Sequence, residues 1–96
     1  MAALTATKVT DREPVGNLFM QTFRATPGSA AADEYILTGF QTVLAVVGFA
    51  PMGATLASMN FVLNALGTGQ TENTTQGALG VESSTTGQFQ VTVLGR

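Results

Sequence analysis

Apolar and polar residues alternate along several segments of this chain, with the period of two that a half-buried β-strand requires. The clearest example is segment 88–94, in which the apolar residues Phe89, Val91 and Val93 are separated by polar ones. The same pattern, or a short apolar run bounded by turn residues, recurs along the rest of the chain. It predicts strands over residues 17–25, 34–38, 42–50, 58–66, 79–82 and 88–94.

Residues that favour turns separate these segments. Pro or Gly occurs in Asp11–Pro14, Thr26–Ser29 and Pro51–Gly53, and both residue types interrupt strands. Short strands with turns every 8–12 residues or so are typical of small sandwiches and barrels. We therefore predict an all-β fold, a small antiparallel β-sandwich or barrel with an extended N-terminal arm at residues 1–14. The 96 residues are expected to form a single β domain, residues 1–96.

One of these strands has a competing interpretation. In segment 58–66, Met59, Val62 and Leu66 would also share one side of an amphipathic helix. The alternation of Met59, Phe61 and Leu63 favours a strand. The pattern leaves both readings open.

The segment Gly67–Gly77 is a polar loop of low sequence complexity. It offers no apolar side chain between Leu66 and Ala78 that could anchor it to a core. We expect a neighbouring subunit to be needed to order this loop.

The charged residues leave a long gap in the middle of the chain. No Asp, Glu, Lys or Arg occurs from Tyr35 through Thr71, and residues 42–56 within that gap are mostly apolar. A chain this small has little interior in which to bury so much apolar sequence. The surplus must lie in a core covered on both faces, in a membrane, or against other subunits.

A membrane helix over residues 42–66 would be long enough to span a bilayer, and a small membrane protein is therefore one alternative. Several features argue against it. Gly48, Pro51 and Gly53 interrupt its middle, and its second half carries two Asn residues. No Lys or Arg lies close to either end to fix an orientation. A membrane location is the less favoured interpretation.

The strand over 42–50 is the best candidate for a subunit interface. A two-sheet sandwich covers only one face of each strand, so strict alternation would leave one of two sets uncovered. The first set is Leu44, Val46 and Met52, and the second is Val43, Ala45, Val47 and Phe49. We expect one set to lie against another subunit. The candidate interface residues are Val43, Leu44, Val46, Val47, Phe49 and Met52.

The composition indicates an assembled protein. Charged residues make up 10% of the chain, against about 25% in ordinary soluble domains, and the net charge is −2. The four cationic residues are scattered, so no basic surface for nucleic acid is expected. So few charges protect a free monomer poorly against association. We expect a homo-oligomer or a subunit of a larger assembly.

The chain offers almost no catalytic chemistry. It lacks Cys and His, and so lacks thiolates, disulfides, the usual zinc ligands and the commonest acid–base catalyst. Asp33 and Glu34 would point to opposite faces of a strand and are expected at a solvated edge. The hydroxyls of Ser83–Thr86 have no base beside them, and Gly67–Gln70 lacks the ending of a phosphate loop. We expect no enzyme activity, no catalytic residue, no metal site and no cofactor.

Several segments together carry a resemblance to a known protein family. After an extended arm, Gly16-Asn17-Leu18 opens a strand and a Pro-Gly turn closes it. The apolar segment Phe40–Gly48 and the alternating segment Asn60–Asn64 follow, and the chain closes on Gln88–Arg96. This order resembles that of the small decoration, or cement, proteins of tailed-phage heads, cyanophage examples included. The similarity covers most of the chain but is one of pattern, without a diagnostic motif.

The resemblance implies a β-rich module on the outer surface of the capsid. Such a protein would be a virion structural protein that binds the major capsid protein and stabilises its lattice, together with other copies of itself. The middle of this chain contains more apolar residues than a domain that only projects from the capsid surface needs. That departure leaves open a second structural role, as a component of the phage tail, neck or baseplate.

Overall fold

The computed structural model describes residues 2–28, 34–52, 59–83 and 87–96, and these residues form strands, turns and loops without any helix. The expected all-β fold is therefore confirmed. Of the residues singled out from the sequence, Ser29, Asp33, Gly53 and residues 84–86 lie outside the described ranges. The strands are β1 (Ala2–Ala3), β2 (Thr7–Lys8), β3 (Glu13–Val15), β4 (Leu18–Ala25), β5 (Glu34–Leu37), β6 (Val43–Pro51), β7 (Met59–Leu63), β8 (Ala78–Ser83) and β9 (Phe89–Gly95).

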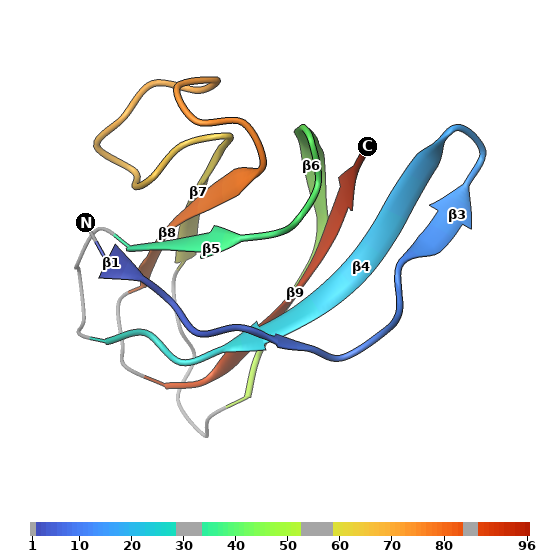
Figure 1. Cartoon of the computed structure of the whole chain (residues 1–96). Coiled ribbons are helices and arrows are strands. Elements are labelled where there is room, and N and C mark those ends of the chain that lie inside the picture. The colour runs from blue at the N-terminus through green and yellow to red at the C-terminus, as the bar shows by residue number, and fades with distance from the viewer. Residues whose placement is uncertain (1, 29–33, 53–58, 84–86) are drawn as a thin grey trace.

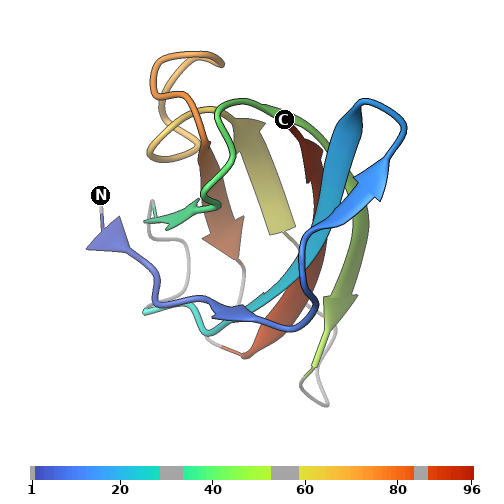
Figure 2. The same cartoon turned by 45° about the vertical axis from the view of Figure 1, so that its right-hand side comes forward.

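The strands build two sheets that pack face to face (Figures 1 and 2). One has the order β1-β5-β8-β7 and the other β2-β4-β9-β6, with β3 paired to β4 as well. Only β1 and β5 run parallel among the described pairs. The inner faces meet in one apolar core, as a small antiparallel sandwich requires. Its largest fully buried apolar side chains are Phe23, Phe89, Ile36, Leu79, Val43, Val81, Val91 and Val93.

Within segment 58–66, the structure forms a strand, β7, over Met59–Leu63. The strand ends at Leu63 because the next residue, Asn64, adopts a positive φ of 55°, which breaks the extended conformation. The helical interpretation of this segment is wrong. A membrane helix over 42–66 is also wrong, since the described part of that range contains β6 and β7. Among the described residues, no helix is long and apolar enough to cross a membrane.

The N-terminal arm joins the two sheets along one side of the sandwich. It pairs with β5 through β1 and then crosses to the other sheet, where β2 and β3 pair with β4 (Figure 1). The sequence placed a turn at Asp11–Pro14, but Glu13 and Pro14 belong to β3. Proline is tolerated there because β3 lies at the edge of its sheet, where a missing N–H disrupts little.

On the opposite side, β6 and β7 approach each other but form no described strand pair. The side chain of Asn64 closes one end of this seam. Its Nδ2 donates to the Val43 carbonyl and its Oδ1 accepts from the Val43 N–H, both at 2.8 Å. The amide thus occupies the place of a paired strand residue. Further along the seam, the rings of Phe49 and Phe61 meet edge to face, with centroids 5.9 Å apart.

The polar loop 67–77 is held by the chain itself. The N–H of Gly77 donates to Asn64 Oδ1 at 3.1 Å, and the N–H of Thr75 donates to the Asn64 carbonyl at 2.8 Å. Gln70 Oε1 accepts from the N–H of Leu66. The loop also lies over the outer face of β8, where a Cβ on Gly80 would come within 3.0 Å of Gly67. The expectation that this loop needs a neighbouring subunit is therefore wrong: backbone and amide groups anchor it in place of apolar side chains.

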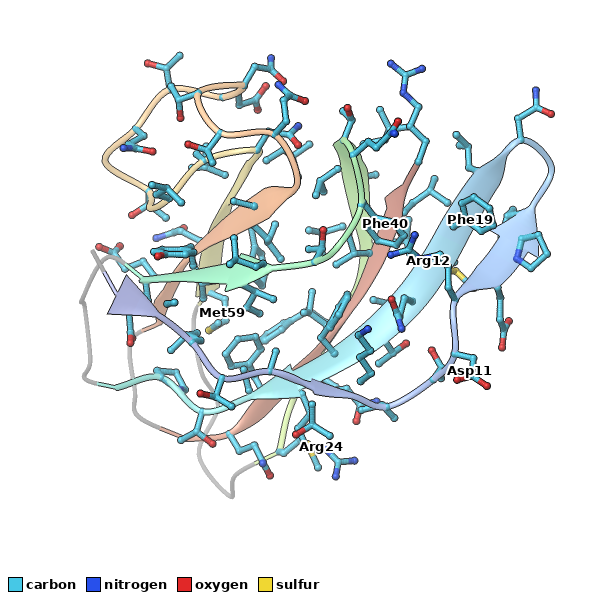
Figure 3. The ribbon with its side chains drawn as sticks, in the orientation of Figure 1. Asp11, Arg12, Phe19, Arg24, Phe40 and Met59 are labelled. Atoms are coloured by element: carbon cyan, nitrogen blue, oxygen red, sulfur yellow. The ribbon has the colours of Figure 1, made fainter. Side chains whose placement is uncertain are left out.

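Arg12 covers one end of the sandwich. Its guanidinium carbon lies 4.5 Å from the ring centroid of buried Phe40 and 5.7 Å from that of Phe19. Figure 3 shows the Arg12 side chain between these two rings. A cation over an aromatic face is attracted by the ring quadrupole, so this contact fixes the base of the arm to the core.

Candidate interaction surface

The outer face of the β3-β4-β9-β6 region carries an apolar surface, with one charged residue, the exposed Glu13 opposite Met20, at its β3 edge. Residues directly opposite in an antiparallel pair share a face, and the register sets Val15 beside Leu18 and Met20 beside Leu94. The next strand adds Ala45, which is opposite Leu94. We call this surface the apolar face. Its residues are Val15, Leu18, Met20, Leu44, Ala45, Val47 and Leu94, of which Val15, Leu44 and Val47 are exposed and the others half-buried.

Two irregularities in β6 give this face its shape. The register shifts between Val43 and Ala45 and again between Val46 and Gly48, so that Leu44 and Val47 are extra residues without a partner of their own on β9. Such β-bulges place two residues opposite one and restart the alternation. As a result, Val43, Val46 and Phe49, each opposite an inward-facing position of β9, are three residues apart, and the spacing returns to two only between Phe49 and Pro51.

The bulges explain why both sequence-derived sets are wrong as sets. Val43 is 1% exposed and belongs to the core, and Val46 packs against that core. Val43 and Val46 are therefore removed from the candidate interface. Leu44 and Val47, one from each set, remain exposed on the outer side, with Val47 53% exposed.

The last two candidates lie away from the apolar face. Phe49 is opposite the inward-facing Val91, and its ring contacts those of Phe61 and Phe89 at the seam between the sheets. Met52 lies just beyond β6, where its N–H donates to the Gln88 carbonyl at 2.8 Å. Both side chains are partly exposed, but neither extends the surface formed by Leu44 and Val47.

Five members of the apolar face were not among the sequence candidates: Val15, Leu18, Met20, Ala45 and Leu94. The alternation of segment 17–25 did place Leu18 and Met20 on the same side. The alternation does not reveal the strand order, which places β4 and β9 between β3 and β6. Only the pairing of distant segments joins these residues to Leu44 and Val47.

The other half of the same outer face is polar. The hydroxyls of Thr22 and Thr92 lie 2.8 Å apart across the β4–β9 pair, and Arg24 Nη2 donates to Gln90 Oε1 at 3.2 Å. The face therefore changes from apolar to hydrogen-bonded along the length of its strands. This division favours one orientation of a bound partner, because the polar groups of an interface determine its specificity more than its affinity.

The face, and not the free edge of β6, is the better place for a partner to bind. An exposed edge invites strand addition, but bulges and proline are the usual means of preventing it. β6 has two bulges and ends at Pro51, which has no N–H to donate. Strand addition along β6 is thus discouraged, while the side chains on its outer side remain available.

The acidic residues that the structure describes do not gather into a metal-binding group. Within the described ranges, no three Asp, Glu, His or Cys residues lie close enough to hold a metal ion. Glu34 was expected at a solvated edge, but this side chain is 5% exposed. Both its carboxylate oxygens accept from the Gly28 N–H, at 3.0 and 2.9 Å. This contact fixes the end of β4 to the start of β5, a structural role.

Comparison with known proteins adds no relative: no protein-family model matches the chain, and neither a curated protein nor a solved structure is significantly similar to it. The argument for function therefore depends on the chain's own composition and geometry.

Proposed function

We propose that this chain is a virion structural protein, a decoration or cement protein that binds the outer surface of the major capsid lattice. The observation that carries the proposal is the apolar face, in which seven uncharged side chains from four strands form one outward surface. Contiguous exposed apolar surface of this kind usually marks a protein interface. The low charge content and the order of the sequence segments support the same role.

A face of seven side chains, of which only Val15, Leu44 and Val47 are exposed, suits a protein that acts in many copies. A monomer's largest apolar patch covers roughly 300–600 Å², whereas a stable pairwise interface needs about 800 Å² from each partner. One such contact is weak alone. On a symmetric lattice the same contact is repeated at every site, and binding to one lattice state stabilises that state by mass action.

The proposal predicts that the purified chain raises the stability of phage heads. Heads of the phage that encodes the chain, prepared without it, should bind the added chain and release their DNA at a higher temperature. At a free concentration of about 100 times the dissociation constant, each site would stabilise the bound lattice by about 2.7 kcal/mol. Sedimentation of heads with and without the chain, followed by thermal release of DNA, measures both effects.

A protein of the same phage that does not bind heads, added at equal concentration, is the control. Failure of the chain to sediment with heads would contradict the proposal. Its recovery in purified tails or baseplates, but not in heads, would replace it with the second structural role.

A further inference from the structure

The first strands of the N-terminal arm are held by few contacts. β1 pairs with β5 at two positions and β2 pairs with β4 at two, and two flanking hydrogen bonds join the Leu4 N–H to Tyr35 and the Val9 N–H to Thr22. Among the arm residues whose side chains the structure describes, only Leu4 and Ala6 pack against the core, and both are partly exposed. Segments with few buried contacts open at low free-energy cost.

The base of the arm is fixed much more firmly. Thr10 accepts two hydrogen bonds from β4, one at its carbonyl from Gln21 Nε2 and one at its hydroxyl from the Thr22 N–H, each at 3.0 Å. Arg12 then covers Phe40 and Phe19. Residues 2–8 can therefore separate from the sheets while the chain from Thr10 onward keeps its contacts.

The arm also lies over a hollow. An open cavity of about 550 Å³ is lined on one side by Ala3, Leu4, Thr5 and Thr7 of the arm. The rest of its lining includes Arg24 and Ala25 at the end of β4, then Thr26, Gly28, Glu34 and Gln88. A segment above a cavity lacks the packing contacts that close-packed interiors supply. The hollow removes packing contacts from the arm residues that line it, and this weakens the attachment of residues 2–8.

We propose that residues 2–8 exchange between copies of this chain, the arm of one copy pairing with β4 and β5 of another. The contacts formed in the exchanged state are those of the closed state, so little contact energy is lost. At about 3.3 Å per residue, the seven residues from 2 to 8 reach roughly 23 Å, more than the molecule's shortest extent of 18 Å. Exchange is favoured when copies are held close together, because effective concentration then offsets the entropy of association.

This inference goes beyond the proposed function, since it concerns contacts between copies and needs no capsid. The chain has no cysteine, so introduced cysteines report cleanly on pairing. Thr7 is opposite Arg24 in the register, within the reach of a disulfide between neighbouring strands. A copy with Thr7→Cys is mixed with a copy with Arg24→Cys, and the mixture is oxidised. We expect the mixed disulfide dimer as the main product, with a yield that rises with the protein concentration before oxidation.

Thr5→Cys is the matched control, because Thr5 is exposed in the same arm but is not opposite Arg24. Exchange predicts a several-fold larger yield of mixed disulfide from Thr7→Cys than from Thr5→Cys. Equal yields from the two arm positions would overturn the proposal, since they indicate an arm that opens without pairing in another copy.

A second pair of introduced cysteines, on the other sheet, tests arm exchange independently if the first pair disturbs folding. Ala3→Cys and Tyr35→Cys occupy opposite positions in the β1–β5 pair and should also join preferentially between copies. Thermal unfolding and circular dichroism establish that each variant is folded before mixing. Substitutions on the apolar face leave the arm intact, so arm exchange and head binding can fail separately.

Discussion

Replacing Gly77 with alanine should cost about 4 kcal/mol or more of folding stability. Gly77 has a φ of +83°, a conformation that L-residues adopt only with strain, and a Cβ there would collide with the carbonyl oxygen of Phe40. The obstacle is backbone, which cannot rotate away as a side chain can. Its surroundings are also fixed, since the Gly77 carbonyl accepts from the N–H and the hydroxyl of Thr38. Chemical denaturation of the variant measures the loss.

Gly16→Ala is the matched control for this experiment. Gly16 has a similar φ of +63°, but a Cβ there would meet no atom within 4 Å. The control isolates the conformational strain, about 1–2 kcal/mol, from the collision. Equal losses in the two variants would contradict the close packing of the loop 67–77 against the segment around Phe40.

Replacing Asn64 with alanine should cost about 3–5 kcal/mol. The Asn64 side chain, 2% exposed, satisfies the N–H and carbonyl of Val43 and the N–H of Gly77. Alanine would leave these buried groups without partners, at about 1–3 kcal/mol for each one that water does not reach. It would also be less tolerant of the positive φ. Because the amide closes the seam, the loss should appear as unfolding of the whole domain in a thermal or urea titration.

Asn60→Ala, in the strand β7 that precedes Asn64, provides the comparison. Asn60 is exposed, and its amide donates to Glu82 Oε1 at 3.2 Å on the surface. Its removal should change stability by no more than about 0.5 kcal/mol. If Asn64→Ala is as mild as Asn60→Ala, the seam between β6 and β7 does not depend on the amide.

The sequence predicted the strands well because burial of one face imposes a period of two. Segment 88–94 became β9 with a shift of one residue, and Phe89, Val91 and Val93 are all in the core. A period of two could not predict the two bulges of β6. Val43, Val46 and Phe49 share the inner side at a spacing of three, and an uninterrupted apolar run hides that spacing. Alternation alone therefore placed Val43 and Val46 on opposite faces, whereas both lie on the inner side.

Long-range contacts account for the remaining differences. Polarity suggested that loop 67–77 would need a neighbouring subunit and that Glu34 would be solvated, but hydrogen bonds can anchor polar residues as firmly as apolar packing. Val43, bonded by Asn64, and Gly28, bonded by Glu34, lie 21 and 6 residues away along the chain, and the sequence does not identify either pairing. The same holds for the apolar face, whose residues meet only through the strand order.

Head binding by Val47→Asp tests the central claim most directly. Val47 points outward from a bulge, so an Asp there should leave folding nearly unchanged, while Val46→Asp, on the inner side, should unfold the domain. Leu37→Asp, with the same change in charge at a 65% exposed residue of the other sheet, is the control. Folded Val47→Asp is expected to bind heads at least about tenfold more weakly in the sedimentation assay, because a carboxylate buried against an apolar partner costs several kcal/mol. Leu37→Asp is expected to bind normally. Normal binding by Val47→Asp would contradict the assignment of the apolar face as the docking surface.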